Sequence, residues 1–478
     1  MKKLSPSVWT VLLLATLACN LGIPALIPTP TATAAPTPKP LNLGHKPLYW
    51  FAPLPPKTFE GETDGSTDFM NLFTPDAPWS QSSNYLQVFK LYGGWAVRDS
   101  TLPQLSQVIQ SVRQRGLALA VEVGPLSPTD QCGSGLEGFA GEEAIPTLQR
   151  IKTAGGDLNF ITMDEPYFNA HLFDGPQACH WTTEKTAQDL DAFIQRARAI
   201  FPNVIVGDIE PITGPGDDRA YKEWIDAFKQ VNGYDLAFLH LDVAWSETNW
   251  PAKVKAIEDH GRERNVPVGI IYLGNFQDPN DEAWLSITGE RVKRYELETG
   301  GQPAHVIFQS WNDKPDHVLP ESNPFSFTGF IKTYFENKAS LGFRPDYLNA
   351  NLAYRKSVRV SSDIRGYEGA LAVDGDLGTF WNSGGLPPKW IETDLGQPTT
   401  VTAIRLVIEQ YPAGDTIHQI WGGADANNQT LLHEFNGFTQ DPNTLEFKPS
   451  PPLTNIRYIK IVTTQSPSWT AWREIEIR

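Results

Sequence analysis

The segment Leu158-Asn159-Phe160-Ile161-Thr162-Met163-Asp164-Glu165-Pro166 decides the fold of this chain. It is a short apolar run of the kind that forms a buried strand, and it ends in two acids and a proline. Seven similar runs flank it between residues 45 and 345. Together the eight runs cover residues 48–53, 87–95, 117–123, 158–165, 204–210, 236–245, 268–276 and 305–311.

Stretches with helical spacing of apolar residues lie between most of these runs. Examples are residues 102–112, 187–197, 224–228 and 254–257. Strand and helix therefore alternate over the whole region, which predicts a (β/α)₈ TIM barrel at 45–345. A doubly wound open sheet is the alternative fold, but no Gly-rich phosphate loop follows the first run, so nucleotide binding has no support.

The composition excludes some classes of protein. The 478 residues include 55 Asp and Glu against 39 Lys and Arg, a formal net charge of −16, and no long Lys/Arg cluster, which argues against nucleic-acid binding. Hydrophobic residues make up 40% of the chain, which excludes intrinsic disorder for most of it. The many aromatic residues, among them 15 Trp, favour a neutral polar ligand such as a sugar.

The N-terminus has the layout of an export signal. Lys2 and Lys3 precede an apolar stretch at 8–18, which is too short to span a membrane. Its end, Thr16-Leu17-Ala18-Cys19, resembles the bacterial lipoprotein signal, which implies cleavage before Cys19, lipidation of that residue and a cell-surface location. An ordinary cleaved signal is the alternative. We expect the signal peptide at 1–19 and a Pro/Thr-rich linker at 20–44.

Two further cysteines remain, Cys132 and Cys179. In an exported protein an even number of cysteines favours a disulfide, and two separate buried thiols are the alternative. The two residues follow the third and fourth predicted strands, so a disulfide would lie on the rim beside Glu165 and would make that rim more rigid.

The carboxyl ends of the predicted strands carry many polar residues, and barrel enzymes place their reactive groups at these ends. Because strand side chains alternate in direction, Asp208 and Glu210 share one face, as do His240 and Asp242. We expect both pairs to point into the barrel mouth and Ile209 to face the helices. A lone acid at a strand end is usually a helix cap or a surface charge, but a cluster of acids usually marks a site.

Paired carboxylates at a barrel mouth suit glycosidic cleavage, which needs one protonated acid and one ionised group. We expect Glu165 to be the acid, with Glu210 as the first choice of partner and Asp242 as the second, and with Asp164 and Asp208 orienting them. No cofactor is needed for this chemistry. The expected substrate-binding residues are Lys90, Tyr92, Glu122, His240, Tyr272, Gln309 and Trp311.

Residues 45–340 resemble the barrel glycoside hydrolases in strand count and acid placement. In the largest clan of these enzymes the acid/base closes strand four, which corresponds to Glu165, and a nucleophilic Glu closes strand seven. Residues 270–275 contain no acid, so this sequence departs from that pattern. Another clan uses an Asp on strand four and an Asp on strand six, which correspond to Asp164 and Asp242. Both assignments stay open.

Residues 350–478 change character to short alternating strands and frequent turns, which predicts an all-β sandwich. The segments that carry a resemblance to the discoidin or coagulation-factor type C domain are 372–381 (AVDGDLGTFW), 390–396 (WIETDLG), 457–461 (RYIKI) and 472–477 (WREIEI). The resemblance implies a jelly-roll sandwich that serves as a carbohydrate-binding module.

Such sandwiches often hold a structural Ca²⁺ beside the Asp-Gly-Asp turn, and a turn without metal is the alternative. The expected calcium ligands are Asp374, Asp376, Thr379 and Glu474. The residues considered for sugar contact are Tyr411, His418, Trp421 and Trp469, each of which could instead belong to the core.

These features predict an exported, lipid-anchored glycoside hydrolase that acts on a polysaccharide or another glycan. Its β-sandwich would hold the substrate near the barrel. The alternative is a non-catalytic cell-surface protein that binds polysaccharide, which the missing acid on strand seven favours.

Overall fold

The computed structural model describes residues 41, 43–44, 46–56, 65–214, 216–247, 249–342 and 350–478, of which 141 and 142 are described without side chains. The predicted signal at 1–19, including Cys19, and nearly all of the predicted linker at 20–44 lie outside these ranges.

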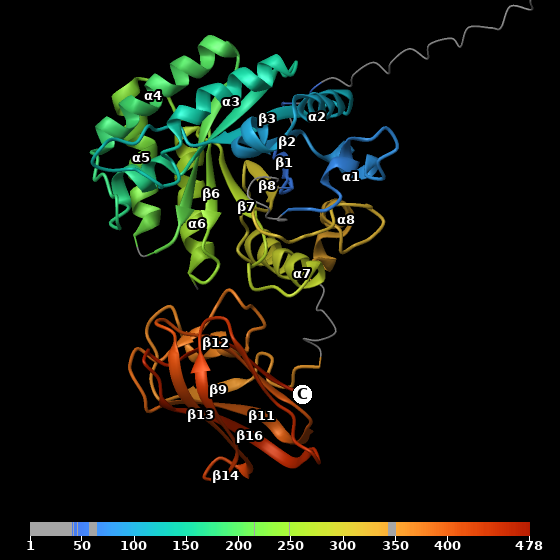
Figure 1. The fold of residues 1–478 in the computed structure, drawn as a ribbon, viewed down its shortest axis with the longest axis vertical. Helices are drawn as coiled ribbons and strands as arrows, with labels where there is room; N and C mark the ends of the chain where they lie inside the picture. The colour runs from blue at the N-terminus through green and yellow to red at the C-terminus, as the bar shows by residue number, and fades with distance from the viewer. Residues whose placement is uncertain are drawn as a thin grey trace, which may run out of the picture. The chain divides into compact units, whose positions relative to one another are not determined.

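The first domain is a closed barrel of eight parallel strands, which confirms the predicted fold. Each strand pairs with the next, and β8 pairs with β1 to close the ring (Figure 1). The strands are β1 (Leu48–Ala52), β2 (Val88–Tyr92), β3 (Ala118–Val123), β4 (Leu158–Asp164), β5 (Ile205–Ile212), β6 (Leu239–Val243), β7 (Val268–Tyr272) and β8 (His305–Gln309).

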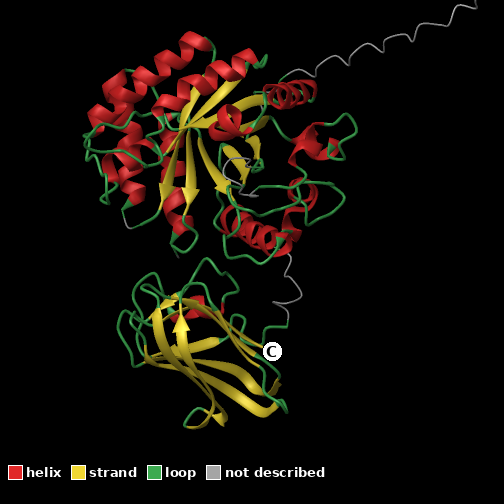
Figure 2. Cartoon of the chain, in the orientation of Figure 1, coloured by secondary structure: helices red, strands yellow, loops and turns green. Residues whose placement is uncertain are grey.

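Helices surround the strands, as Figure 2 shows in red around yellow. The α-helices are α1 (Ser80–Tyr85), α2 (Leu102–Gln114), α3 (Gly141–Thr153), α4 (Thr183–Ile200), α5 (Asp217–Asn232), α6 (Trp250–Arg264), α7 (Asp281–Val292) and α8 (Phe327–Asn337). Two single-turn π-helices, η2 (Trp95–Asp99) and η3 (Phe168–Leu172), follow β2 and β4. Such turns are frequent at functional sites.

Helix α2 illustrates how the sequence forms these elements. The Thr101 side chain accepts a hydrogen bond from the Gln104 amide at 3.3 Å, and the Gln104 side chain accepts one from the Thr101 amide at 2.8 Å. This reciprocal capping box satisfies amides that the helix start would leave unpaired. The apolar residues spaced along α2 are buried against the barrel.

Aromatic rings fill the lower part of the barrel. Trp50 contacts the rings of Phe160, Phe238 and His240, with centroids 4.8–5.6 Å apart. The interior is thus a packed core, and the space for a ligand lies above it, at the carboxyl ends of the strands.

The second domain is an antiparallel sandwich, also as predicted. One sheet has the order β10-β17-β12-β15 and the other β14-β13-β16-β11-β9. The strands are β9 (Ser357–Val360), β10 (Trp381–Asn382), β11 (Lys389–Val401), β12 (Ile404–Glu409), β13 (Gly414–Asp425), β14 (Asn428–Thr439), β15 (Thr444–Phe447), β16 (Leu453–Gln465) and β17 (Ala471–Ile477).

The core of the sandwich contains Trp381, Trp472 and a set of buried aliphatic residues. No helix within the described ranges is both long enough and apolar enough to cross a membrane.

Candidate active site

A pocket of about 560 Å³ opens at the carboxyl ends of the barrel strands. Acids dominate its polar lining, together with Arg98 and Gln309, while Trp95 and Trp311 provide aromatic surface. The acids at the pocket wall include Glu122, Glu137, Asp164, Glu165 and Asp242.

Glu165 lies directly after β4, and its backbone is unusual. Its φ of 44° is in the left-handed region, which a residue other than glycine adopts only at a cost of about 1–3 kcal/mol. Its amide donates to the Ile209 carbonyl at 3.0 Å, and its side chain accepts a hydrogen bond from Asn169 at 3.3 Å. Strained residues held in this way cluster at active sites.

Burial, together with the charges of Asp242, Asp164 and Glu137, raises the pKa of Glu165 to about 10. Burial also raises the pKa of Asp242 to about 7, with a contribution from Glu122. The pKa of Asp164 is raised well above its ordinary value by burial and by Glu122. Glu165 therefore keeps its proton up to a higher pH than Asp242 does.

Lys90 is buried under the pocket and joins two of its walls. Its ammonium group forms an ion pair with Glu122 and donates to Gln309 Oε1 at 2.6 Å. Nearby, the hydroxyl of Tyr92 donates to the Ser310 carbonyl at 2.6 Å. Lys90 therefore positions Glu122 and Gln309, whereas Tyr92, Glu122 and Gln309 themselves line the pocket.

Trp311 lies on the rim after β8. It lines the pocket and also a second hollow, which shares Glu165 and Asp242 with the first.

The predicted direction of Asp208 and Glu210 is wrong. Ile209 pairs with Asp164 and lines the pocket, so its neighbours on β5 point outward to the helix layer. Asp208 accepts a hydrogen bond from the Trp224 indole on α5 at 2.9 Å. The alternation rule assigns these residues correctly to one face, but it does not say which face is inside.

Glu210 has its own partners behind the pocket wall. It accepts hydrogen bonds from the amides of Tyr167 at 2.7 Å and Phe168 at 2.8 Å, so it holds the segment that follows Glu165. Burial raises the pKa of Asp208 to about 8 and raises the pKa of Glu210 well above its ordinary value. Both residues lie outside the pocket lining.

Two residues expected to bind substrate also lie elsewhere. His240 points inward as predicted, but it lies in the aromatic core below the pocket and forms a 2.8 Å hydrogen bond with His305. Tyr272 faces the helices and stacks on Trp245, because Ile271 takes the inward position on β7.

Glu137, Trp95 and Arg98 also line the pocket, although the sequence did not predict them as site residues. Trp95 and Arg98 belong to the π-helix after β2, and Glu137 lies on the loop after β3. Loop residues have no periodicity to reveal their direction. The one available signal for Glu137 was its position five residues after Cys132, on a loop already expected to border Glu165.

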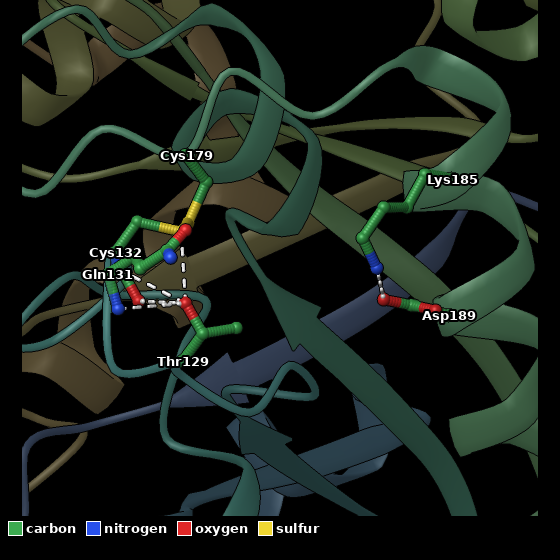
Figure 3. Close-up of a disulfide and its surroundings, with 6 residues drawn as sticks. All are labelled: Thr129, Gln131, Cys132, Cys179, Lys185 and Asp189. Atoms are coloured by element: carbon green, nitrogen blue, oxygen red, sulfur yellow. Dashed lines mark hydrogen bonds and ion pairs between the residues drawn. A yellow bond between two sulfur atoms is a disulfide. The ribbon is translucent and has the colours of Figure 1, made fainter.

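The predicted disulfide between Cys132 and Cys179 is present (Figure 3). It joins the loop after β3 to the segment that precedes α4. Thr129 supports it through a tight turn, in which its hydroxyl accepts a hydrogen bond from the Cys132 amide at 3.2 Å.

In the sandwich, the predicted calcium residues come together around one turn. The Thr379 hydroxyl donates to Asp374 at 2.9 Å, and the Gly375 amide donates to Glu474 at 3.1 Å. Asp376 accepts a hydrogen bond from the Gly378 amide at 2.9 Å.

The carboxyl groups at this turn suit a bound cation. Burial raises the pKa of Asp374 to about 8, and burial and the Asp374 charge raise the pKa of Glu474 well above its ordinary value. Two buried, mutually repelling carboxylates with a nearby hydroxyl are hard oxygen donors that suit Ca²⁺. Across the described residues, no group of three or more His, Cys, Asp and Glu is arranged for a metal, so backbone oxygens would have to complete the shell.

Exposed apolar side chains gather on three loops of the sandwich. Leu386, Tyr411 and Trp469 are 65%, 76% and 36% exposed, and we call them the loop patch. Ser468 donates to the Tyr411 carbonyl at 2.6 Å and the Thr470 amide donates to the Gly385 carbonyl at 3.2 Å, so the three loops are joined.

The other two residues considered for sugar contact differ. His418 is buried and forms a 2.9 Å hydrogen bond with Thr463, so it belongs to the core. Trp421 is partly buried, and its indole donates to Gln419 at 3.2 Å.

The family model of the F5/8 type C domain matches residues 357–475, which run from β9 into β17. The chain therefore contains an F5/8 type C domain, as the sequence motifs predicted. No curated protein matches the chain.

Several solved structures are similar to part of the chain. Chitosan-binding module 1 of a Paenibacillus chitosanase/glucanase is 27% identical over 27% of this chain and 98% of that one, with a TM-score of 0.24. The family 32 CBM of Clostridium perfringens NanJ, in complex with galactose, is 17% identical over 26% and 93%, with a TM-score of 0.23. A fucose-binding module of Streptococcus pneumoniae is 20% identical over 27% and 93%, with a TM-score of 0.23.

Proposed function

We propose that the barrel is a glycoside hydrolase and that the F5/8 type C domain is its carbohydrate-binding module. The observation that carries the proposal is the pair Glu165 and Asp242 at one pocket wall, with pKa values of about 10 and about 7. Glycosidic cleavage needs this separation, because one carboxyl must donate a proton while the other is ionised.

Glu165 would protonate the glycosidic oxygen, and Asp242 would act as the nucleophile or as the base that activates water. This assignment reverses the expected order of partners, because Asp242 faces the pocket and Glu210 does not. Trp311 would stack on the sugar ring at the border between the two hollows.

The loop patch of Leu386, Tyr411 and Trp469 supports the binding role of the sandwich. Exposed aromatic rings stack on the C–H faces of sugars, and the Trp469 indole is already held by Glu409 at 2.9 Å. Calcium at Asp374, Thr379 and Glu474 would hold the turn between η6 (Gly369–Val373) and β10. Binding by the sandwich would raise the concentration of polysaccharide near the barrel.

Release of reducing ends from a panel of purified polysaccharides tests the catalytic proposal. Glu165→Gln and Asp242→Asn should each lower turnover by about 10²-fold or more, since acid–base groups contribute that much. Asp174→Asn is the matched control, because the Asp174 side chain is 92% exposed on the loop after β4. Unchanged turnover in Glu165→Gln would remove the assignment. Binding without cleavage of any glycan by the unaltered protein would favour the non-catalytic alternative.

The export and anchoring of the protein are part of the same proposal. Cys19→Ala should move the protein from the membrane fraction to the soluble fraction, because a lipid chain on Cys19 would be lost. Unchanged partitioning of this variant would contradict the anchor and leave the catalytic proposal intact.

A further inference from the structure

The loop that carries Glu137 packs directly on the catalytic end of β4. Gly138 has a φ of 40°, and a Cβ atom there would lie 3.1 Å from the Glu165 carbonyl oxygen and 3.3 Å from that of Asp164. A larger residue would therefore push the loop away from β4. The close approach places the neighbouring Glu137 at the pocket wall with Glu165 and Asp242.

Several contacts hold this loop to the segment after β4. The Cys132–Cys179 disulfide is the covalent one (Figure 3). Beside it, the Gly133 amide donates to the Gln177 carbonyl at 2.9 Å. Further along, Phe139 packs edge-on against Trp181 with centroids 5.3 Å apart. The loop is thus fixed at both ends of the stretch that contains Glu137.

The charged groups around Glu165 come from several elements. Asp164 precedes it on β4, Asp242 approaches from β6, and Glu137 approaches from the loop. Glu210 on β5 and Tyr221 on α5 lie behind it. Glu137 and Glu165 both line the pocket, and the charge of Glu137 contributes to raising the pKa of Glu165.

We propose that Glu137 is a positioning residue that keeps the catalytic proton on Glu165, and that the Cys132–Cys179 disulfide keeps Glu137 in reach. This inference rests on the proposed glycosidase function. Glu137 itself need not touch the substrate. It acts through Glu165, by repelling the negative charge that Glu165 would acquire on losing its proton.

The test compares Glu137→Gln with Asp130→Asn in the full-length protein. Asp130 is an exposed acid on the same loop and outside the pocket, so both variants remove one negative charge. The pKa of Glu165 is read directly by carbon-13 NMR of labelled Glu carboxyls, with the Glu165 signal assigned by its loss in Glu165→Gln. We expect Glu137→Gln to lower this pKa by about one unit or more and Asp130→Asn to leave it unchanged.

Activity provides a second readout. The alkaline limb of kcat/KM should move to lower pH in Glu137→Gln, while KM at low pH stays unchanged, and Glu137→Asp should restore part of the shift. Equal Glu165 titration in Glu137→Gln and Asp130→Asn would overturn the inference. Because the NMR titration needs no substrate, it decides the inference even if the unaltered protein cleaves no polysaccharide, which would instead contradict the proposed function.

The role of the disulfide is tested with Cys132→Ser/Cys179→Ser. We expect the same downward shift of the Glu165 pKa as in Glu137→Gln, and no further shift when the two changes are combined. If the double variant does not fold, the Glu165 pKa is measured instead in the folded protein after its disulfide has been reduced with dithiothreitol. A Glu165 pKa that is unchanged without the disulfide would contradict this part of the inference.

Discussion

Glu210 holds the backbone of Tyr167 in place, because its Oε1 atom accepts a hydrogen bond from the Tyr167 amide at 2.7 Å. Its Oε2 atom does the same for Phe168 at 2.8 Å. Since these residues follow Glu165 in the chain, the two hydrogen bonds fix the strained turn on which Glu165 lies. Glu210 thus holds the backbone that follows Glu165 in place.

We therefore predict that removal of Glu210 lowers both stability and activity. Glu210→Ala leaves two amides without an acceptor, and each costs about 1–3 kcal/mol if it stays buried. Glu210→Gln keeps one acceptor oxygen and should lose less. Urea denaturation measures the loss, and Glu223→Gln, an exposed change on α5, is the control. Equal stability of Glu210→Ala and the control would contradict this role.

The fold was accessible from the sequence because it depends on repeated local patterns. Eight apolar runs separated by helical spacing leave few alternatives to a barrel, and the motifs around Asp374 and Trp472 identify the sandwich. The pairing of Cys132 with Cys179 followed from the cysteine count once Cys19 was assigned to the predicted export signal.

The site was only partly accessible. The directions of Asp208 and Glu210 depend on the register between β4 and β5, where Asp164 pairs with Ile209. That register is a long-range property, which the order of polar and apolar residues within one strand does not contain. Glu137 was missed for a related reason, since its position depends on the close packing of Gly138 against β4.

If the turn at Asp374 binds calcium, the melting temperature of the sandwich should depend on calcium. Because Ca²⁺ would bind the folded sandwich and not the unfolded chain, it should raise the melting temperature of that domain, and a chelator should lower it. Asp374→Asn should abolish the response, whereas Asp415→Asn, an exposed change on β13, should preserve it. Calorimetry of the full chain with calcium and with chelator makes the measurement. A melting curve that is insensitive to the chelator would exclude the site.

We expect the aromatic residues of the loop patch to bind polysaccharide. Tyr411→Ala and Trp469→Ala should each weaken binding by about two- to tenfold, the range that corresponds to aromatic contacts of 0.5–1.5 kcal/mol. Leu431→Ala is the control, because Leu431 is also exposed but lies on β14, where it pairs with Trp421. Calorimetric titration in a Glu165→Gln background keeps the substrate intact. Equal affinity of all three variants would place the binding site elsewhere.

Because the acids of the pocket have raised pKa values in the folded protein, we expect their contribution to the stability of the fold to decrease as the pH rises. The folded pKa of Glu165 is about 10, well above its ordinary value of 4.5, so the folded state keeps a proton that the unfolded chain releases. Stability from this group is fully present at pH values below about 4.5 and is lost progressively up to about 10. Asp242 acts in the same direction between its ordinary value of 3.8 and about 7.

Glu165→Gln removes the titrating group and should therefore raise the melting temperature relative to the unaltered protein more at pH 9 than at pH 5. The comparison within each pH cancels the opposite effect of His240 and His305, whose pKa values burial lowers. Calorimetry at a fixed saturating calcium concentration keeps the Asp374 turn constant, and Asp174→Asn is again the control. A difference between Glu165→Gln and the unaltered protein that is the same at both pH values would show that Glu165 does not keep its proton in the folded state, and would remove the basis for its role as the acid.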